Sequence, residues 1–195
     1  SRRQRQMCIR DRYKCIDNNG GANSTVEPSG NKSTSVFSTG DSYKWKYMYS
    51  LSASEQANFL STDFMHVSTE SSDFSTTGGA IEHVKITAGG TSGSNGTYTG
   101  VDIRGDGSSG KATVVVSSNA VTAVTITTAG SGYTFASIKA SDFGNVSGSD
   151  IDFIISPPGG HAKDIIAELG GFFVMLNVNL TQAEGSGDFN TANDF

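Results

Sequence analysis

The chain has 195 residues and a formal net charge of −5, which makes it a poor partner for the phosphate backbone of a nucleic acid. No apolar run approaches the roughly 18 residues that a membrane-spanning helix needs, so no span is expected. The chain has 24 Gly but only 3 Pro, and short runs of Val, Ile, Thr and aromatic residues recur along it. This composition predicts a mainly-β protein with many turns.

The first twelve residues stand apart, because they hold five of the arginines in an acidic chain. One allowed codon per residue from Arg2 spells the adapter of transposase-based sequencing libraries, and only the third base of the Arg12 codon lies outside it. Residues 1–12 are therefore predicted to be a non-native, adapter-derived segment of a translated fragment, with the natural N-terminus missing and an equally arbitrary C-terminus. Without them, 9 basic and 18 acidic residues leave a net charge of −9. Cys15 then has no partner for an internal disulfide, which suits a reducing compartment.

The segment 13–79 begins with a short strand candidate, YKCI at 13–16, and continues as a polar loop over 17–41 that could include one short strand. YKWKYMYSL at 43–51 alternates and predicts a strand with an aromatic core face and a solvated lysine face. A base-stacking platform is the alternative interpretation, which the negative charge disfavours. A capping box, Ser52 with Glu55, predicts a short helix over 52–60, and DFMHVST at 63–69 is expected to be a strand.

Residues 80–149 are expected to form an inserted domain, because 80–140 contain a repeat. IEHVKITAGG from Ile81 matches VTAVTITTAG from Val121 at an offset of 40, and TYTGVDI at 97–103 matches GYTFASI at 132–138. Between them, KATVVVSSNAV predicts a strand and an Asn-containing turn. Two such units predict a small antiparallel β domain.

Residues 150–195 return to the first domain. DIDFIIS at 150–156 predicts a strand, and PPGGHAKDIIAELGG predicts a turn followed by one or two helical turns from about Lys163, with Gly170 as the C-cap. FFVMLNVNL at 172–180 is apolar on both faces and predicts a central strand.

Candidate chemistry is weak along the chain. GDGSSGKA at 105–112 resembles a phosphate-binding loop, but Ala112 lacks the hydroxyl for Mg²⁺ and a strand rather than a helix is expected to follow, so a β-turn is preferred. RGD at 104–106 is interpreted as turn chemistry, and Asp102 with Asp106 lacks the further carboxylates of a calcium site. Cys15 shows no sign of activation, and the histidines lie apart at 66, 83 and 161. No catalytic, cofactor-binding or metal-ligating residue is predicted, and no cofactor is expected.

Three segments together resemble one family: YKCIDNNGGANSTVEPSG at 13–30, YKWKYMYSLSASEQANFLSTDFM at 43–65 and ISPPGGHAKDIIAELGGFFVMLNVNL at 155–180. They are similar to the baseplate wedge subunit of T-even-type contractile-tailed phages, the gene product 8 family, in its marine phage branch. The resemblance covers most of residues 13–180. The β repeat is less diagnostic, because GSGYT-containing modules also resemble parts of other phage tail proteins.

The resemblance implies an antiparallel β-sandwich with a few short peripheral helices, formed by 13–79 and 150–195 and truncated at both ends. It implies a structural virion protein of the tail baseplate, assembled in the host cytoplasm, with no catalysis. The implied partners are other wedge subunits and a second copy of the full-length protein, with no nucleic acid, membrane or small-molecule substrate. The 17–41 loop and the PPGGH turn are the expected assembly contacts.

Two other functions are weighed against this one. A tail-fibre or adhesin-like module that binds glycan is motivated by Tyr98 and Tyr133, which are expected to be exposed so that their rings can stack on sugars. A tail-associated hydrolase would need paired carboxylates, and no pair in the sequence stands out.

Overall fold

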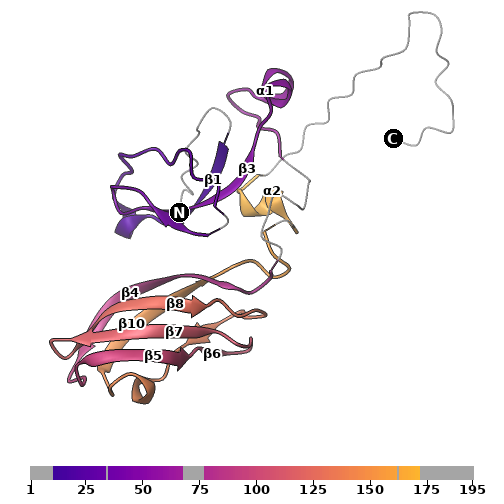
Figure 1. Cartoon of the computed structure of the whole chain (residues 1–195). Helices are drawn as coiled ribbons and strands as arrows, with labels where there is room; N and C mark the ends of the chain where they lie inside the picture. The colour runs from indigo at the N-terminus through magenta and orange to yellow at the C-terminus, as the bar shows by residue number, and fades with distance from the viewer. Residues whose placement is uncertain (1–10, 34, 68–76, 162, 172–195) are drawn as a thin grey trace, which may run out of the picture.

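The computed structural model describes residues 11–33, 35–67, 77–161 and 163–171, and it is mainly β, as the composition predicts. The elements fall into two groups, which form two lobes in Figure 1. The N-terminal lobe comprises β1 (Asp11–Asp17), a 3-10 turn (Asn19–Gly21), β2 (Phe37–Ser38), β3 (Lys44–Ser50), α1 (Ala53–Phe59) and α2 (Ile165–Glu168). The repeat lobe comprises β4 (Ile81–Thr91), β5 (Gly96–Asp102), β6 (Arg104–Gly105), β7 (Lys111–Ser117), β8 (Ala120–Thr128), β9 (Ala136–Ser137), a 3-10 turn (Ala140–Asp142) and β10 (Ser147–Ile155).

The N-terminal lobe is built on an antiparallel sheet in the order β1-β3-β2. β1 begins at Asp11, so Asp11 and Arg12, which belong to the segment predicted to be adapter-derived, pair with β3 in this structure. Tyr13, Tyr43 and Trp45 form one buried cluster on the sheet. A second cluster lies where α2 packs on the end of β3, and it contains Met48, Tyr49, Leu51, Ile165 and Leu169. β3 is thus covered on both faces.

The repeat lobe packs a two-stranded sheet, β10-β4, against a three-stranded sheet, β5-β7-β8. Its core takes apolar side chains from both sheets, including Ile86 and Ile151 from the first and Val114, Val116 and Val121 from the second. The predicted asparagine turn is confirmed between β7 and β8, where Ser118 and Asn119 both have positive φ, at 52° and 64°. That backbone twist matches the twist of the strands it joins.

The first half of each repeat unit forms a strand, as predicted. Ile81 begins β4, and Val121 lies next to the start of β8. The second halves differ. In TYTGVDI, residues 97–102 lie in β5, whereas GYTFASI contains only the two-residue β9. β10 pairs with β4 along nearly its whole length, so the strand crosses the position at 149/150 where the sequence analysis places a domain boundary.

The other predicted elements have mixed outcomes. The helix over 52–60 is confirmed as α1 with both hydrogen bonds of its capping box, and Gly170 caps α2 with a φ of 75°. The strand predicted at 63–69 is wrong over 63–67, which form bends and irregular chain, while 68–69 lie outside the described residues. The strand predicted at 172–180 also lies outside them. Among the residues described, no helix is long and apolar enough to cross a membrane.

Candidate functional site: a buried charged junction between the lobes

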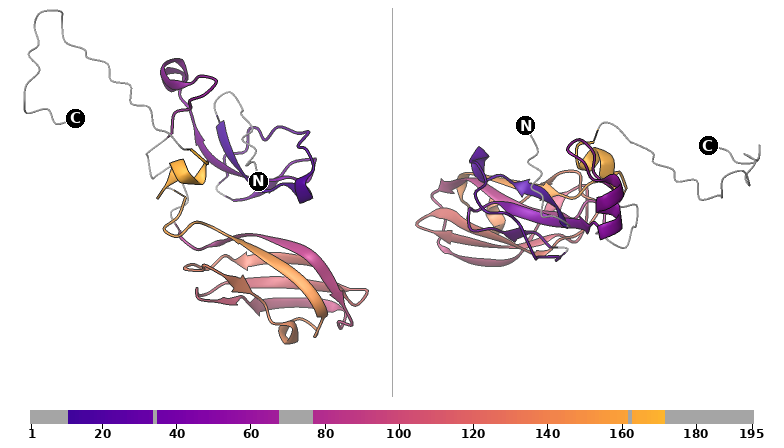
Figure 2. Two further views of the ribbon diagram at one scale, coloured as in Figure 1. Left: turned by 180° about the vertical axis from the view of Figure 1, so that it is seen from behind. Right: turned by 90° about the horizontal axis from the view of Figure 1, so that it is seen from above.

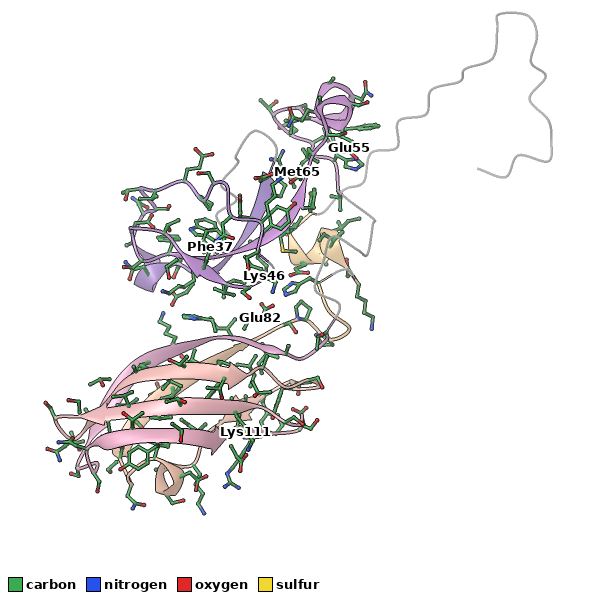
Figure 3. The ribbon with its side chains drawn as sticks, viewed as in Figure 1. Phe37, Lys46, Glu55, Met65, Glu82 and Lys111 are labelled. Carbon is green, nitrogen blue, oxygen red and sulfur yellow. The ribbon has the colours of Figure 1, made fainter. Side chains whose placement is uncertain are left out.

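Five ionisable side chains meet where the two lobes face each other. Lys14 comes from β1, Lys46 from β3, Glu82 from β4 and Glu168 from α2, while His161 lies in the segment between β10 and α2. Figure 3 shows Lys46 and Glu82 directed toward each other from the two lobes. Four of these side chains are almost completely buried, with exposed fractions of 6% for Lys46, 7% for Glu82, 5% for Glu168 and 1% for His161. We call these five residues the junction cluster.

The cluster is organised around the His161 ring. Its Nε2 lies 2.6 Å from Oε1 of Glu82, and its Nδ1 hydrogen-bonds Oε1 of Glu168. The same two carboxylate oxygens each have a lysine partner. Lys46 Nζ lies 2.5 Å from Glu82 Oε1, and Lys14 Nζ lies 2.6 Å from Glu168 Oε1. The cluster therefore links three elements of the N-terminal lobe to β4 of the repeat lobe.

A β-bulge in β4 helps Glu82 to reach the other lobe. Ile155 of β10 pairs with Ile81 and Ile154 pairs with His83, so Glu82 is an extra residue without a partner opposite it. A bulge changes the direction in which side chains point and breaks the strict alternation of the strand. Consistent with this, Glu82 and its neighbour His83 both contact the N-terminal lobe, where His83 Nε2 lies 3.7 Å from Asp17 Oδ2. Lys85 lies 3.8 Å from the other oxygen of Asp17.

Burial and hydrogen bonding act in opposite directions on the pKa values of the cluster. For Glu82, burial acts to raise the pKa, but hydrogen bonds from His161 and Lys46 outweigh it and leave the pKa below its usual value. For His161, burial acts to lower the pKa, but the hydrogen bonds to Glu168 and Glu82 outweigh it and raise the pKa above its usual value. Both shifts favour the charged forms, as expected where a buried charge has opposite charges in contact.

The backbone beside the cluster is equally constrained. Residues 77–80 lead into β4 and residues 156–161 follow β10, at the same end of the repeat lobe (Figure 2). Buried Ser156 joins them, because its hydroxyl accepts from the Ala80 amide at 2.8 Å and donates to the Thr77 carbonyl at 2.9 Å. Gly78 passes so close to Gly159 that a Cβ on Gly78 would lie 2.4 Å from the Gly159 nitrogen. The connection is thus packed against itself as well as held by charge.

Comparison with protein-family models, curated proteins and solved structures gave no match.

The predicted solvated lysine face of β3 is wrong at Lys46, which is 5% exposed as a residue. On the aromatic face, Tyr43, Trp45 and Tyr49 are buried as predicted, and Tyr47 is half-buried. The alternation fails because the register between β1 and β3 shifts around Met48, and because the repeat lobe covers the lysine side at Lys46.

The loop that resembles a phosphate-binding loop is a β connection, as preferred from the sequence. Lys111 begins β7, so a strand and not a helix follows it, and its Nζ lies 2.5 Å from Asp102 Oδ1. The buried ring of Tyr133 fills the inside of the loop, where a Cβ on Gly107 would lie 2.4 Å from the ring. The backbone amide of Gly110 donates to the Tyr133 hydroxyl. A protein side chain therefore occupies the position that a phosphate would take.

The RGD sequence has its own partners inside the fold. Arg104 pairs with Asp142 at 2.8 Å, and Asp106 accepts from the hydroxyl and the amide of Thr134. The hydrogen bonds from Thr134, its hydroxyl first, lower the pKa of Asp106 to about 2. Asp102 and Asp106 are thus each engaged by a different neighbour, which supports the interpretation as turn chemistry.

The three histidines lie in three different environments. His66 contacts Glu55 of α1 at 3.1 Å, His83 faces Asp17, and His161 is at the centre of the junction cluster. Within the ranges that the structure describes, no group of three or more His, Cys, Asp or Glu could hold a metal ion. Burial, followed by the charges of Asp17 and Asp41, raises the pKa of Cys15 to about 11.

The glycan-stacking surface is not formed as expected. Tyr133 is 1% exposed, and its hydroxyl donates to the Ile103 carbonyl at 3.0 Å, so its predicted exposure is wrong. Tyr98 is half-buried and packs against the core of the repeat lobe. Tyr133 turns inward because it fills the space left by the glycines around it, which the match to Tyr98 in the repeat did not indicate.

The junction cluster was not predicted from the sequence, although the repeat contains a signal for it. Glu82, His83 and Lys85 of the first copy align with Thr122, Ala123 and Thr125 of the second. The three residues of the second copy are exposed, whereas those of the first copy contact the N-terminal lobe. Ionisable residues that occur in only one copy of the repeat therefore indicate which surface of that copy contacts the other lobe.

Proposed function

We propose that the protein is a structural component of a phage tail baseplate wedge, which acts in tail assembly through contacts with other wedge subunits and catalyses no reaction. One observation carries the proposal beyond the sequence resemblance. The three segments that resemble the wedge subunit are distant in the sequence, yet each supplies a member of the junction cluster: Lys14 from the first, Lys46 from the second, and His161 with Glu168 from the third.

The arrangement suits an assembly part. The cluster pairs its buried charges with one another and joins two β lobes, so these ionisable side chains hold the fold together. A buried ion pair is weak evidence for stability but can specify one arrangement among several. A tail component must present its surfaces in a defined relative orientation, and a charged junction between two lobes provides such a constraint.

The surface loops also fit this role. Asp41 holds the 17–41 loop by accepting from the amides of Thr25 and Val26 and from the hydroxyls of Ser24 and Thr39. These hydrogen bonds, that of Thr39 first among them, lower the pKa of Asp41. A long loop fixed in this way is suited to make contacts. In the PPGGH turn, His161 and Gly160 are buried, which leaves Pro158 and Gly159 exposed for a neighbour.

The test is mass spectrometry of purified contractile-tail particles from the source of this sequence. Peptides of residues 13–195 should be present in a fixed ratio to the tail-tube protein, whichever density fraction of intact particles is taken. The reading frames beside this one should encode sheath, tube or other wedge proteins. Recovery of the peptides from cell envelopes and not from particles would overturn the proposal.

A further inference from the structure

His161 makes two hydrogen bonds that a neutral imidazole cannot make together. Both ring nitrogens contact carboxylate oxygens, one of Glu82 and one of Glu168. Ionised carboxylates only accept, so each ring nitrogen must donate, and a neutral ring carries only one N–H. With both carboxylates ionised, this geometry is satisfied by an imidazolium that carries a proton on each nitrogen.

The charged groups around the ring come from every element packed against it. β4 supplies Glu82, α2 supplies Glu168, β3 supplies Lys46 and β1 supplies Lys14. Farther along the same junction, His83 and Lys85 of β4 face Asp17 of β1, and Lys44 also acts on His83. With His161 protonated, the cluster holds three positive and two negative charges in contact.

Loss of one proton would disrupt the link between the lobes. Each carboxylate oxygen at the ring also accepts from a lysine, so a neutral His161 would turn a ring lone pair toward one of these acceptor oxygens. A buried contact between two acceptors is unfavourable, because neither group can regain its hydrogen bond from water. Of the two contacts, the one with Glu82 spans the lobes, and Lys46 would be left as its partner there.

We propose that the junction cluster is a pH-sensitive clamp, in which the two lobes are fixed in one relative orientation while His161 is protonated and become free to move when it loses a proton. The proposal rests on the described contacts and does not depend on the baseplate assignment. The group that binds at this site is a proton. The property that changes is the relative orientation of the two lobes, which are connected where Gly78 passes close to Gly159.

The direction of the pH response follows from the pKa of His161. Burial acts to lower this pKa, but the hydrogen bonds to Glu168 and Glu82 raise it overall above the usual 6.5. The stabilisation is therefore complete below about pH 6.5 and is lost as the pH rises through the raised value. His83 behaves in the opposite way, since burial in particular lowers its pKa, and its contribution is lost as the pH falls below 6.5. The two histidines can thus be separated by the sign of their effects.

The test combines NMR of ¹⁵N-labelled histidine with a distance measurement between two spin labels, after Cys8 and Cys15 are changed to serine. The labels are placed on exposed Glu27 and Thr125, one in each lobe. At pH 6.5 both nitrogens of His161 should show the imidazolium pattern, and the distance distribution should be narrow. As the pH rises through the titration of His161, the distribution should widen. His161→Gln should be wide at every pH, whereas the matched control His83→Asn should retain the transition.

A second variant keeps the proposal testable if His161→Gln does not fold. Glu168→Gln removes one carboxylate from the ring and should move the transition to lower pH. A neutral His161 at pH 6.5 would overturn the proposal. So would a distance distribution that stays unchanged up to pH 10, or a transition that survives in His161→Gln and disappears in His83→Asn.

Discussion

Lys46 Nζ lies 2.5 Å from Glu82 Oε1, and both side chains are less than a tenth exposed. Lys111 and Asp102 of the repeat lobe lie at the same distance, 2.5 Å, but their side chains are 47% and 65% exposed. The two ion pairs therefore have the same geometry in different surroundings. An unpaired buried charge cannot be solvated. The burial of each ion pair, rather than its distance, should therefore decide how much the pair contributes to the free energy of unfolding.

The first prediction compares these two pairs. Lys46→Met should lower the free energy of unfolding by about 3 kcal/mol, because it leaves Glu82 buried with only His161 as its charged partner. Lys111→Met, the matched control, should change it by less than about 0.5 kcal/mol. Urea unfolding followed by tryptophan fluorescence measures both. Equal effects of the two substitutions would contradict the claim that the Lys46–Glu82 pair is buried.

The second prediction concerns the Tyr133 hydroxyl, which bridges the Gly110 amide and the Ile103 carbonyl inside the repeat lobe. Tyr133→Phe should destabilise the protein by about 1–3 kcal/mol, since it leaves a buried donor and a buried acceptor unpaired. Tyr98→Phe removes an exposed hydrogen bond to the Ser94 carbonyl and should cost about 0.5 kcal/mol or less. Thermal unfolding of the two variants compares them, and a larger loss in Tyr98→Phe would argue against the position of Tyr133.

The third prediction tests the close approach of the connecting segments. Gly78→Ala should lower stability by about 2 kcal/mol or more, because its Cβ would lie 2.4 Å from the Gly159 nitrogen and the backbone must move. Gly96→Ala is the control, since the atoms nearest to its Cβ would be those of the Tyr98 ring, at an ordinary contact distance of 3.5 Å. Calorimetry should give a clearly lower unfolding temperature for Gly78→Ala alone. Tolerance of alanine at Gly78 would mean that the two segments lie farther apart.

The fourth prediction concerns the reactivity of Cys15, whose pKa is raised from 9.0 to about 11, mainly by burial. At pH 8 the fraction of thiolate should be about 100-fold lower than in the unfolded chain, and alkylation should slow accordingly. Iodoacetamide labelling of a Cys8→Ser variant, with and without urea, measures the ratio. Equal rates in the two conditions would show that the thiol is neither shielded nor perturbed.

Local signals in the sequence predicted much of the fold. The capping box of Ser52 and Glu55, the turn at Asn119 and the C-cap at Gly170 each depend on neighbouring residues, and each is confirmed. The strand expected over 63–67 is wrong, because its residues have strand-like composition but no neighbouring strand pairs with them in the described structure. Amino-acid composition predicts a tendency to form a strand, whereas the pairing of that strand with a neighbour depends on the rest of the fold.

The junction cluster could not be predicted by the same means, because it depends on contacts between distant residues. Lys14 and Glu168 are 154 positions apart, and His161 and Glu82 are 79 apart. The bulge that presents Glu82 is set by its register with β10, which the local sequence does not reveal. Only the comparison of the two repeat copies, Glu82 against Thr122, contained a trace of the interface.

The central claim is that the buried cluster joins the two lobes into one body, and ¹⁵N relaxation of the backbone amides at pH 6.5 tests it most directly. The amides of β3 in the N-terminal lobe and of β7 in the repeat lobe should give the same rotational correlation time, that of the whole chain. Two different and shorter correlation times, one for each lobe, would show that the lobes tumble independently and would contradict the account.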